Sequence, residues 1–159
     1  MTQKQALDRV REDEFFHLSN RLLFKMFKTT NIMHTVGTAW TQSLNLTTQQ
    51  WSVIGALSRP GFENGTGIGA LTEFLQVSRQ NLAGLLERLE NQGITRRVAN
   101  PNDGRARLVQ LTPEGWKIWD TLVPMMSQFY ERALDGFSAE DITKFLVYID
   151  RLQENLQKT

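Results

Sequence analysis

Apolar residues return every three or four positions along much of this chain, which is the period of an amphipathic helix. Residues 15–44 carry such a stripe and predict one long helix, or two helices separated by a break near residues 29–31. The stripe is made of Phe15, Leu18, Leu22, Met26, Met33, Val36 and Trp40, with Phe16, Leu23 and Phe27 beside it. A long helix with so much apolar surface needs a partner surface.

Three shorter helices are predicted next. Thr47, followed by Gln50 three positions later, has the spacing of a capping box and predicts a helix that ends before Pro60. A turn-rich loop then leads to a short helix around residues 68–75. Ser78 is placed to cap a third helix, which Gly93 would end. Its apolar residues, Leu82, Leu85, Leu86 and Leu89, follow the spacing of one buried face.

The remaining sequence predicts a hairpin and two more helices. Residues 94–98 and 108–111 are short β-type runs, and the Asn-Pro and Asp-Gly pairs between them are turn signals. Pro113 stands at the first position of a long helix with a kink expected near Pro124. Ser138 begins a last helix with an apolar stripe. The fold class is therefore mainly α with a small β wing.

The order helix, helix, helix, hairpin over residues 47–112 is that of a winged helix-turn-helix lobe, which binds double-stranded DNA. Residues 1–46 and 113–159 form a helical region around it, within a single domain over residues 1–159. Their long apolar stripes exceed what the lobe can cover, which predicts a homodimer. Packing within one chain is the alternative.

The composition excludes several other classes of protein and site. The chain has 159 residues and no cysteine, which excludes disulfides and thiolate metal sites. Two histidines, His17 and His34, do not make a metal site alone, so no metal and no cofactor are expected. No run approaches the roughly 18 apolar residues of a membrane span, and the first residues are polar. These features predict a soluble cytoplasmic protein with no membrane partner.

The cationic residues of the lobe are all arginine. No lysine stands between Lys28 and Lys117, and arginine suits phosphates and guanine edges better than lysine does. On the helix after Ser78, the candidate DNA-binding residues are Ser78, Arg79, Gln80, Asn81, Gly84 and Arg88. Gln80 and Arg88 are the first choices for base contacts, and Gly84 suggests a close approach. An ordinary solvated face with an incidental glycine is the alternative.

The hairpin gives the stronger signal for DNA. Arg96, Arg97, Arg105 and Arg107 lie within twelve residues that contain one acid, Asp103. The negative potential of a narrow minor groove attracts such a tip, although a solvated hairpin is the alternative.

The same segment resembles the MarR (multiple antibiotic resistance regulator) family. The resemblance rests on the runs GITRR (93–97), NPNDGR (100–105) and LTPEG (111–115). It implies a homodimeric transcription regulator, in which Asp103 braces the wing and Arg105 enters the minor groove. The glycine-rich loop at residues 60–67 departs from the family and could change how the following short helix is presented.

The resemblance also implies a small aromatic or phenolic acid as effector, and repression as the usual outcome. Such a ligand would shift the dimer to a state with wrongly spaced DNA-binding helices. The candidate ligand-binding residues are His17, Arg21, Met33, Trp40 and Trp51, with Arg21 as the partner of a carboxylate. Met33, Trp40 and Trp51 are alternatively core residues, and His17 a surface or interface histidine.

Two rival functions remain. An enzyme is disfavoured because the sequence has no phosphate-binding glycine loop, no nucleophile elbow and no metal-ligand spacing. A protein-binding adaptor with a winged helix would lack basic groups on its wing, whereas this chain concentrates arginine there.

Overall fold

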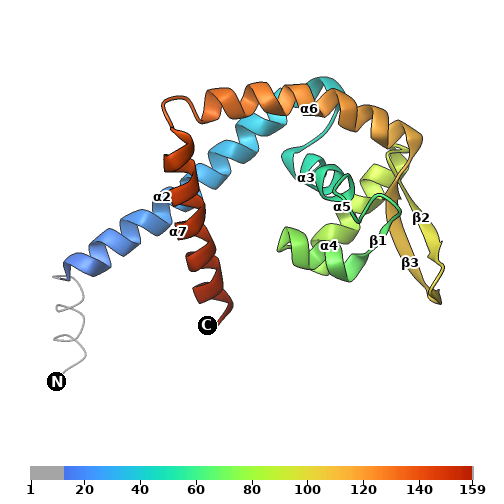
Figure 1. Cartoon of the computed structure of the whole chain (residues 1–159), viewed down its shortest axis with the longest axis horizontal. Helices are drawn as coiled ribbons and strands as arrows, with labels where there is room; N and C mark the ends of the chain where they lie inside the picture. Colours follow the sequence, from blue (N-terminus) through green and yellow to red (C-terminus); the bar gives the residue numbers. More distant parts are fainter. Residues whose placement is uncertain (1–12, 159) are drawn as a thin grey trace. The chain divides into compact units, whose positions relative to one another are not determined.

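The computed structural model describes residues 13–158, so the first twelve residues of the predicted 1–46 region and Thr159 lie outside it. The chain divides after Leu122 into two compact units, which are described in turn. Figure 1 gives the order of the helices and strands. A mainly helical chain with one small three-stranded sheet confirms the predicted fold class.

The first long helix, α2, runs without interruption from Glu14 to Trp40. Asp13 caps it by accepting a hydrogen bond from the backbone N–H of Phe15 at 2.9 Å. The alternative of two helices with a break near residues 29–31 is therefore wrong. The helix ends earlier than residue 44, because a 3-10 turn, η1 (Gln42–Leu44), and a left-handed residue at Asn45 turn the chain toward the next helix.

Helix α3 (Thr48–Leu57) begins with the predicted capping box. The Thr47 hydroxyl accepts from the N–H of Gln50, and the Gln50 side chain accepts from the N–H of Thr47 at 2.9 Å. Helices α2 and α3 approach closely at Gly37, where an added Cβ would lie 2.8 Å from the Thr48 hydroxyl oxygen. A buried hydroxyl, that of Thr41, closes the turn between them by donating to the carbonyl of Leu46 at 2.7 Å.

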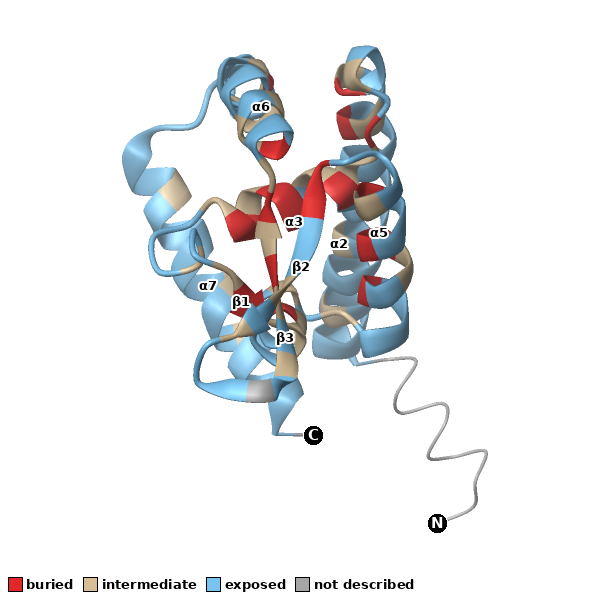
Figure 2. Ribbon diagram, turned by 90° about the vertical axis from the view of Figure 1, so that its right-hand side faces the viewer, coloured by how far each residue is buried: buried red, intermediate tan, exposed pale blue. Residues whose placement is uncertain are grey.

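Helices α4 (Ile68–Leu75) and α5 (Arg79–Asn91) complete the helical part of the lobe. Gln76 ends α4 in a left-handed conformation, with φ of 53°, which makes the turn between the two helices tight. The buried residues of the lobe, coloured red in Figure 2, gather on α3, α5 and the sheet. They include the four predicted leucines, Leu82, Leu85, Leu86 and Leu89, all at 4% exposure or less.

The sheet has the order β1-β3-β2 and contains one strand that the sequence did not predict. Strand β1 (Thr66–Gly67) pairs with β3 (Asp103–Leu111) on the side opposite β2 (Thr95–Asn100). Gly65 has a φ of 101°, and a Cβ added to it would lie 3.1 Å from the Cβ of Leu108, so both the backbone conformation and the close approach favour glycine.

The hairpin strands extend further toward the tip than predicted. Strand β3 begins at Asp103 rather than Leu108, and the β2–β3 register continues to Ala99 opposite Arg107, followed by an irregularity at Asn100. Ladder hydrogen bonds join backbone groups and tolerate the polar side chains that led us to expect a long loop.

Helix α6 (Pro113–Ala133) is fixed to the sheet at its first turn. The Thr112 hydroxyl donates to the carbonyl of Gly93 at 2.6 Å and accepts from the N–H of Gly115 at 3.0 Å. Gly115 is buried against the backbone of Ile94, so closely that no side chain fits there. Pro124 lies inside the helix, which continues past it.

The second unit consists of the end of α6 from Val123 and helix α7 (Ala139–Gln157). Ser138 caps α7 as predicted, and its hydroxyl donates to the Asp141 carboxylate at 2.6 Å. This bond, with that of the Ser138 N–H, lowers the pKa of Asp141 below its ordinary value. Large apolar residues on α7 are exposed, among them Phe145, Leu146, Tyr148 and Leu156. No helix among the described residues is long and apolar enough to cross a membrane.

The Gly115 contact leads to a test of the joint between the sheet and α6. We expect Gly115→Ala to destabilise the fold by about 1–3 kcal/mol, because the new methyl group would overlap the Ile94 carbonyl oxygen. The matched control is Gly69→Ala in α4, where nothing lies within 4 Å of an added Cβ and a gain of up to about 1 kcal/mol is expected. Urea unfolding of both variants measures the difference, and equal stability would contradict the contact.

Candidate nucleic-acid interface

The start of α5 presents a row of polar side chains to solvent. Ser78 caps the helix by accepting from the N–H of Asn81 at 3.2 Å. The buried leucines fix the rotation of the helix about its axis. Arg79, Gln80 and Asn81 are consequently exposed, as the sequence predicted for a face that reads DNA.

Gly84 lies one turn further along α5, and the space above it is open. An added Cβ would meet no atom of the described chain within 4 Å, and the glycine has no unusual φ. Nothing inside the protein therefore requires glycine here. Glycine costs about 1 kcal/mol relative to alanine in a helix, which leaves the approach of an external surface as a physical reason for it.

We define the wing as the β2–β3 hairpin. At its tip, two side chains each accept a hydrogen bond from the backbone N–H two residues further on. The Asp103 carboxylate accepts from the N–H of Arg105 at 3.0 Å, and the Asn100 side chain accepts from the N–H of Asn102 at 2.9 Å. Asp103 thus shapes the backbone that carries Arg105.

The four wing arginines differ in what they contact. Arg97 forms an ion pair with Glu90 of α5 at 3.0 Å. With the Gln110 amide oriented so that its oxygen faces the guanidinium, Arg96 donates to it from Nε and Nη2, both at 2.7 Å. Arg105 and Arg107 are exposed, and no ion pair is made to either by the residues that the structure describes. Arg105 and Arg107 are therefore free to bind phosphates. Arg96 instead joins β2 to β3, and Arg97 joins the wing to α5.

Arg88 stands apart from the other α5 candidates. It lies eight residues after Gln80, which is about 12 Å along the helix axis, and it lines a cleft between α5, α3 and α2. The sequence pattern placed it on the exposed side but gave no sign of this cleft.

The predicted ligand residues are not brought together in one cavity. His17 and Arg21 share a shallow hollow with Glu14 and Leu18, all from α2. Met33 is 54% exposed, so the core alternative is wrong at that position, and its place in a ligand site stays a prediction. Trp40 and Trp51 are half-buried, and Trp51 packs against the core of the lobe.

Comparison with known proteins identifies the family. Residues 44–106 match the model of the MarR family. Over 159 residues the chain is 38% identical to the transcriptional activatory protein BadR of Rhodopseudomonas palustris, covering 99% of this chain and 91% of BadR. The chain belongs to the MarR family. The MarR proteins are DNA-binding transcription regulators, which confirms the interpretation of the wing motif.

Two further MarR-type proteins are similar to this chain. The chain is 34% identical to the transcriptional regulator HosA of Escherichia coli O111:H- over 115 residues, which cover 71% of this chain and 82% of HosA. A crystal structure of a MarR mutant from E. coli complexed with operator DNA superposes with a TM-score of 0.76, covering 88% of this chain and 99% of that one. Its sequence identity is 20%, so it shows that the fold is shared.

Gly84 offers a test that separates stability from binding. In this MarR-family protein, Gly84→Ala should raise the free energy of unfolding by up to about 1 kcal/mol, since the methyl group meets open space. If DNA backbone or bases approach that point, the same change should weaken binding to the operator at least about tenfold. Thermal unfolding and fluorescence anisotropy on one preparation give both values. Unchanged affinity would show that nothing approaches Gly84.

Proposed function

We propose that this chain is a ligand-responsive repressor that binds a pseudo-palindromic operator as a homodimer. The first turn of α5 enters the major groove, where Gln80 contacts bases and Arg79 and Asn81 contact bases or phosphates. The wing reaches the adjacent minor groove through Arg105. The observation that carries this proposal is that Arg105 and Arg107 are exposed and form no ion pair with any described residue, together with the exposed polar face of α5.

The remaining candidate residues position the first turn of α5 and the wing, or contact DNA outside these two elements. Arg97 and Glu90 hold the wing against α5 at 3.0 Å, which sets the distance between the two groove-binding elements. Arg96 stiffens the wing through Gln110, and Asp103 shapes its tip. Ser78 caps α5 and leaves its N-terminal turn facing the duplex. Arg88, about 12 Å further along α5 than Gln80, contacts the DNA backbone rather than the bases for which it was a first choice.

The wing hypothesis is tested with DNA from the chain's own upstream region. Arg105→Ala should weaken binding to all sequences and lower the slope of log K against log salt by about one, the loss of one phosphate contact. Gln80→Ala should instead change the preference among sequences. Anisotropy titrations at rising salt measure both. Arg151→Ala on α7, outside the winged helix-turn-helix lobe, removes the same charge and should leave the slope unchanged. An equal effect of both arginine variants would contradict a specific role of the tip.

Dimerisation follows from the apolar surface of α2. Phe15, Leu18 and Leu22 are 76%, 55% and 54% exposed, and exposed large apolar residues on one helix face mark an interaction surface. A second copy of the same chain is the commonest partner for such a face. The operator would then have half-sites about one helical turn apart.

A charge on that stripe should separate the two copies. We expect Leu22→Glu to shift sedimentation from dimer to monomer, because the carboxylate would be buried in the interface without a partner. Asn31→Glu is the matched control, since it adds the same charge half a turn around the helix from Leu22. A wild-type chain that sediments as a monomer at micromolar concentration would contradict the proposal.

The effector remains the small aromatic or phenolic acid of the sequence analysis. His17 and Arg21 would bind it in their hollow on α2, completed by the second copy. Isothermal titration with a panel of aromatic acids tests this part. If none of the acids gives heat, the effector hypothesis is wrong, and the proposal of DNA binding is unaffected.

Activation is the second candidate outcome. It is favoured by the name of BadR, a transcriptional activatory protein that resembles this chain over almost its whole length. Both outcomes use the same operator contacts and differ in where the operator lies relative to the promoter. A promoter–reporter fusion in cells with and without the protein decides between them.

A further inference from the structure

Among the residues that the structure describes, six adopt a positive φ, and one of them is an unusual choice for that conformation. Four are glycines, and a fifth is Asn45, with φ of 52°. The sixth is Gln76, with φ of 53°, in the turn between α4 and α5. The left-handed region favours glycine, and asparagine is enriched there among the other residues, whereas glutamine is not. Glycine would satisfy the backbone at position 76, so the glutamine side chain needs another explanation.

The Gln76 side chain is held at the end of α4. Its Nε2 donates to the carbonyl of Glu73 at 2.7 Å, and this carbonyl belongs to the last turn, where such groups lack a partner within the helix. The bond is exposed, so water can replace it, and capping alone gains little to offset the backbone conformation.

The same amide has a donor that the protein does not use. An amide nitrogen carries two N–H groups, and the bond to Glu73 takes one of them. The second N–H remains on an exposed side chain, and no described residue accepts a hydrogen bond from it. The turn between α4 and α5 therefore presents an oriented, neutral donor to solvent.

Gln76 stands directly before the residues that we propose to bind DNA. Three positions separate it from Arg79, and an extended chain of that length spans at most about 11 Å. One strand of B-DNA carries a phosphate about every 3.4 Å of helix axis, so a duplex in contact with Arg79 has several phosphates within that distance. In a helix-turn-helix, the first helix crosses the DNA backbone. The turn that ends α4 meets phosphates when the first turn of α5 enters the major groove.

We propose that Gln76 donates its second amide N–H to a DNA phosphate and thereby positions the first turn of α5 in the groove. This inference deepens the proposed function and rests on it. The bond to Glu73 orients the amide before DNA arrives, so binding costs little side-chain freedom. The contact carries no sequence information, since phosphate contacts fix register and orientation while base contacts specify sequence.

The neutral amide gives this contact a signature that separates it from the arginine contacts. Arg105 and other cations release condensed counterions when they bind phosphates, whereas an amide releases none. Loss of the Gln76 contact should lower affinity at every salt concentration without changing the slope of log K against log salt. It should do so for all sequences alike, unlike loss of Gln80.

The test is Gln76→Gly, which suits the left-handed backbone and removes only the side chain. Its affinity for the operator, measured by anisotropy, should fall at least about tenfold, the size of a lost hydrogen bond to a charged group. Its thermal unfolding midpoint should stay within about 4 °C of the wild type, because relief of the backbone conformation offsets the lost cap.

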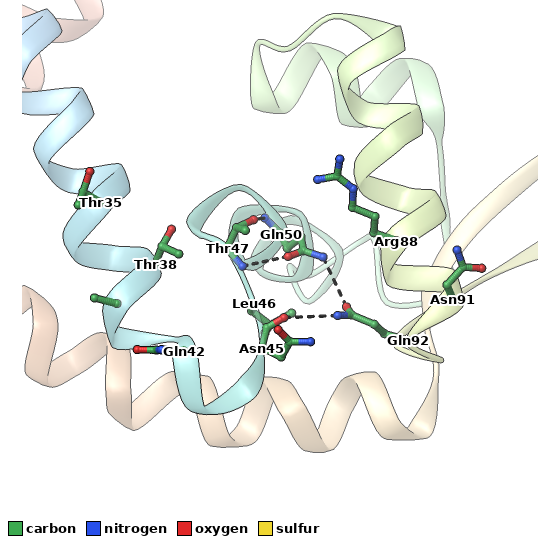
Figure 3. A pocket seen from close by; sticks show the side chains of 11 residues that line it. Thr35, Thr38, Gln42, Asn45, Leu46, Thr47, Gln50, Arg88, Asn91 and Gln92 are labelled. Atoms are coloured by element: carbon green, nitrogen blue, oxygen red, sulfur yellow. Dashed lines mark hydrogen bonds between the residues drawn. The ribbon is translucent and has the colours of Figure 1, made fainter.

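Asn45→Gly is the matched control, since it places glycine at the other left-handed position. The carbonyl of Asn45 accepts from the Gln92 side chain at 3.3 Å (Figure 3). Gln92 directly follows α5, whose 13 residues extend about 20 Å, so Asn45 lies at the end of that helix far from Gln76. Asn45→Gly should bind the operator as the wild type does.

The phosphate itself is identified with duplexes in which one phosphate at a time is replaced by a neutral methylphosphonate. At one position in each half-site, the wild type should lose at least about tenfold more affinity than Gln76→Gly does, because the variant no longer has the partner of that phosphate.

Three results would overturn the contact. Wild-type affinity in Gln76→Gly would show that the side chain only caps α4, and an equal loss in Asn45→Gly would show that any loosened turn has the same effect. Equal methylphosphonate losses in the wild type and Gln76→Gly at every position would exclude a bond to phosphate. These results leave the proposed function standing, whereas a wild-type chain that binds no duplex refutes the proposed function and this contact with it.

Discussion

The packing of one side of α5 into the core determines the rest of this structure. Leu82, Leu85, Leu86 and Leu89 are almost fully buried, and each contributes about 1.5–3 kcal/mol relative to an exposed position. That burial fixes the rotation of the helix, so the polar residues of its first turn must face outward. It also fixes the position of Glu90, to which the wing is bound through Arg97. The two elements that we propose to bind the grooves are thus held to each other by the interior.

Glycine and small polar groups complete this arrangement where backbones approach closely. Gly115 allows α6 to begin against Ile94, and the Thr112 hydroxyl joins the same two segments by hydrogen bonds. Gly37 does the same between α2 and α3. The joints between the helices of the lobe and the long helices are therefore tight, which is a condition for transmitting a change in the geometry of the proposed dimer to the candidate DNA-binding residues.

Local signals in the sequence predicted most of the elements. The Thr47 and Ser138 caps are confirmed, because a capping box depends on residues three positions apart. The leucine face of α5 and the start of α6 are confirmed for the same reason, and the wing motif identified the family. Strand β1 was missed, since two residues, Thr66 and Gly67, pair with partners more than forty positions away and carry no period of their own.

The sites were harder to predict than the elements. The ion pair of Arg97 and the amide contact of Arg96 depend on register and on a partner helix, which a count of arginines does not reveal. The cleft around Arg88 is assembled from residues 35–50 and 88–92, so no local pattern marks it. The ligand residues expected from the family resemblance lie apart, because His17 and Arg21 stand near the start of α2, Met33 and Trp40 stand further along it, and Trp51 belongs to α3.

The central claim is that two copies of α5 and the wing bind adjacent grooves of one duplex. Hydroxyl-radical footprinting of the operator tests it most directly. The account predicts two symmetric sets of protected sugars, with protected minor grooves flanking two major-groove contacts about one helical turn apart. A single protected stretch without two-fold symmetry, or protection that leaves the flanking minor grooves open, would contradict it.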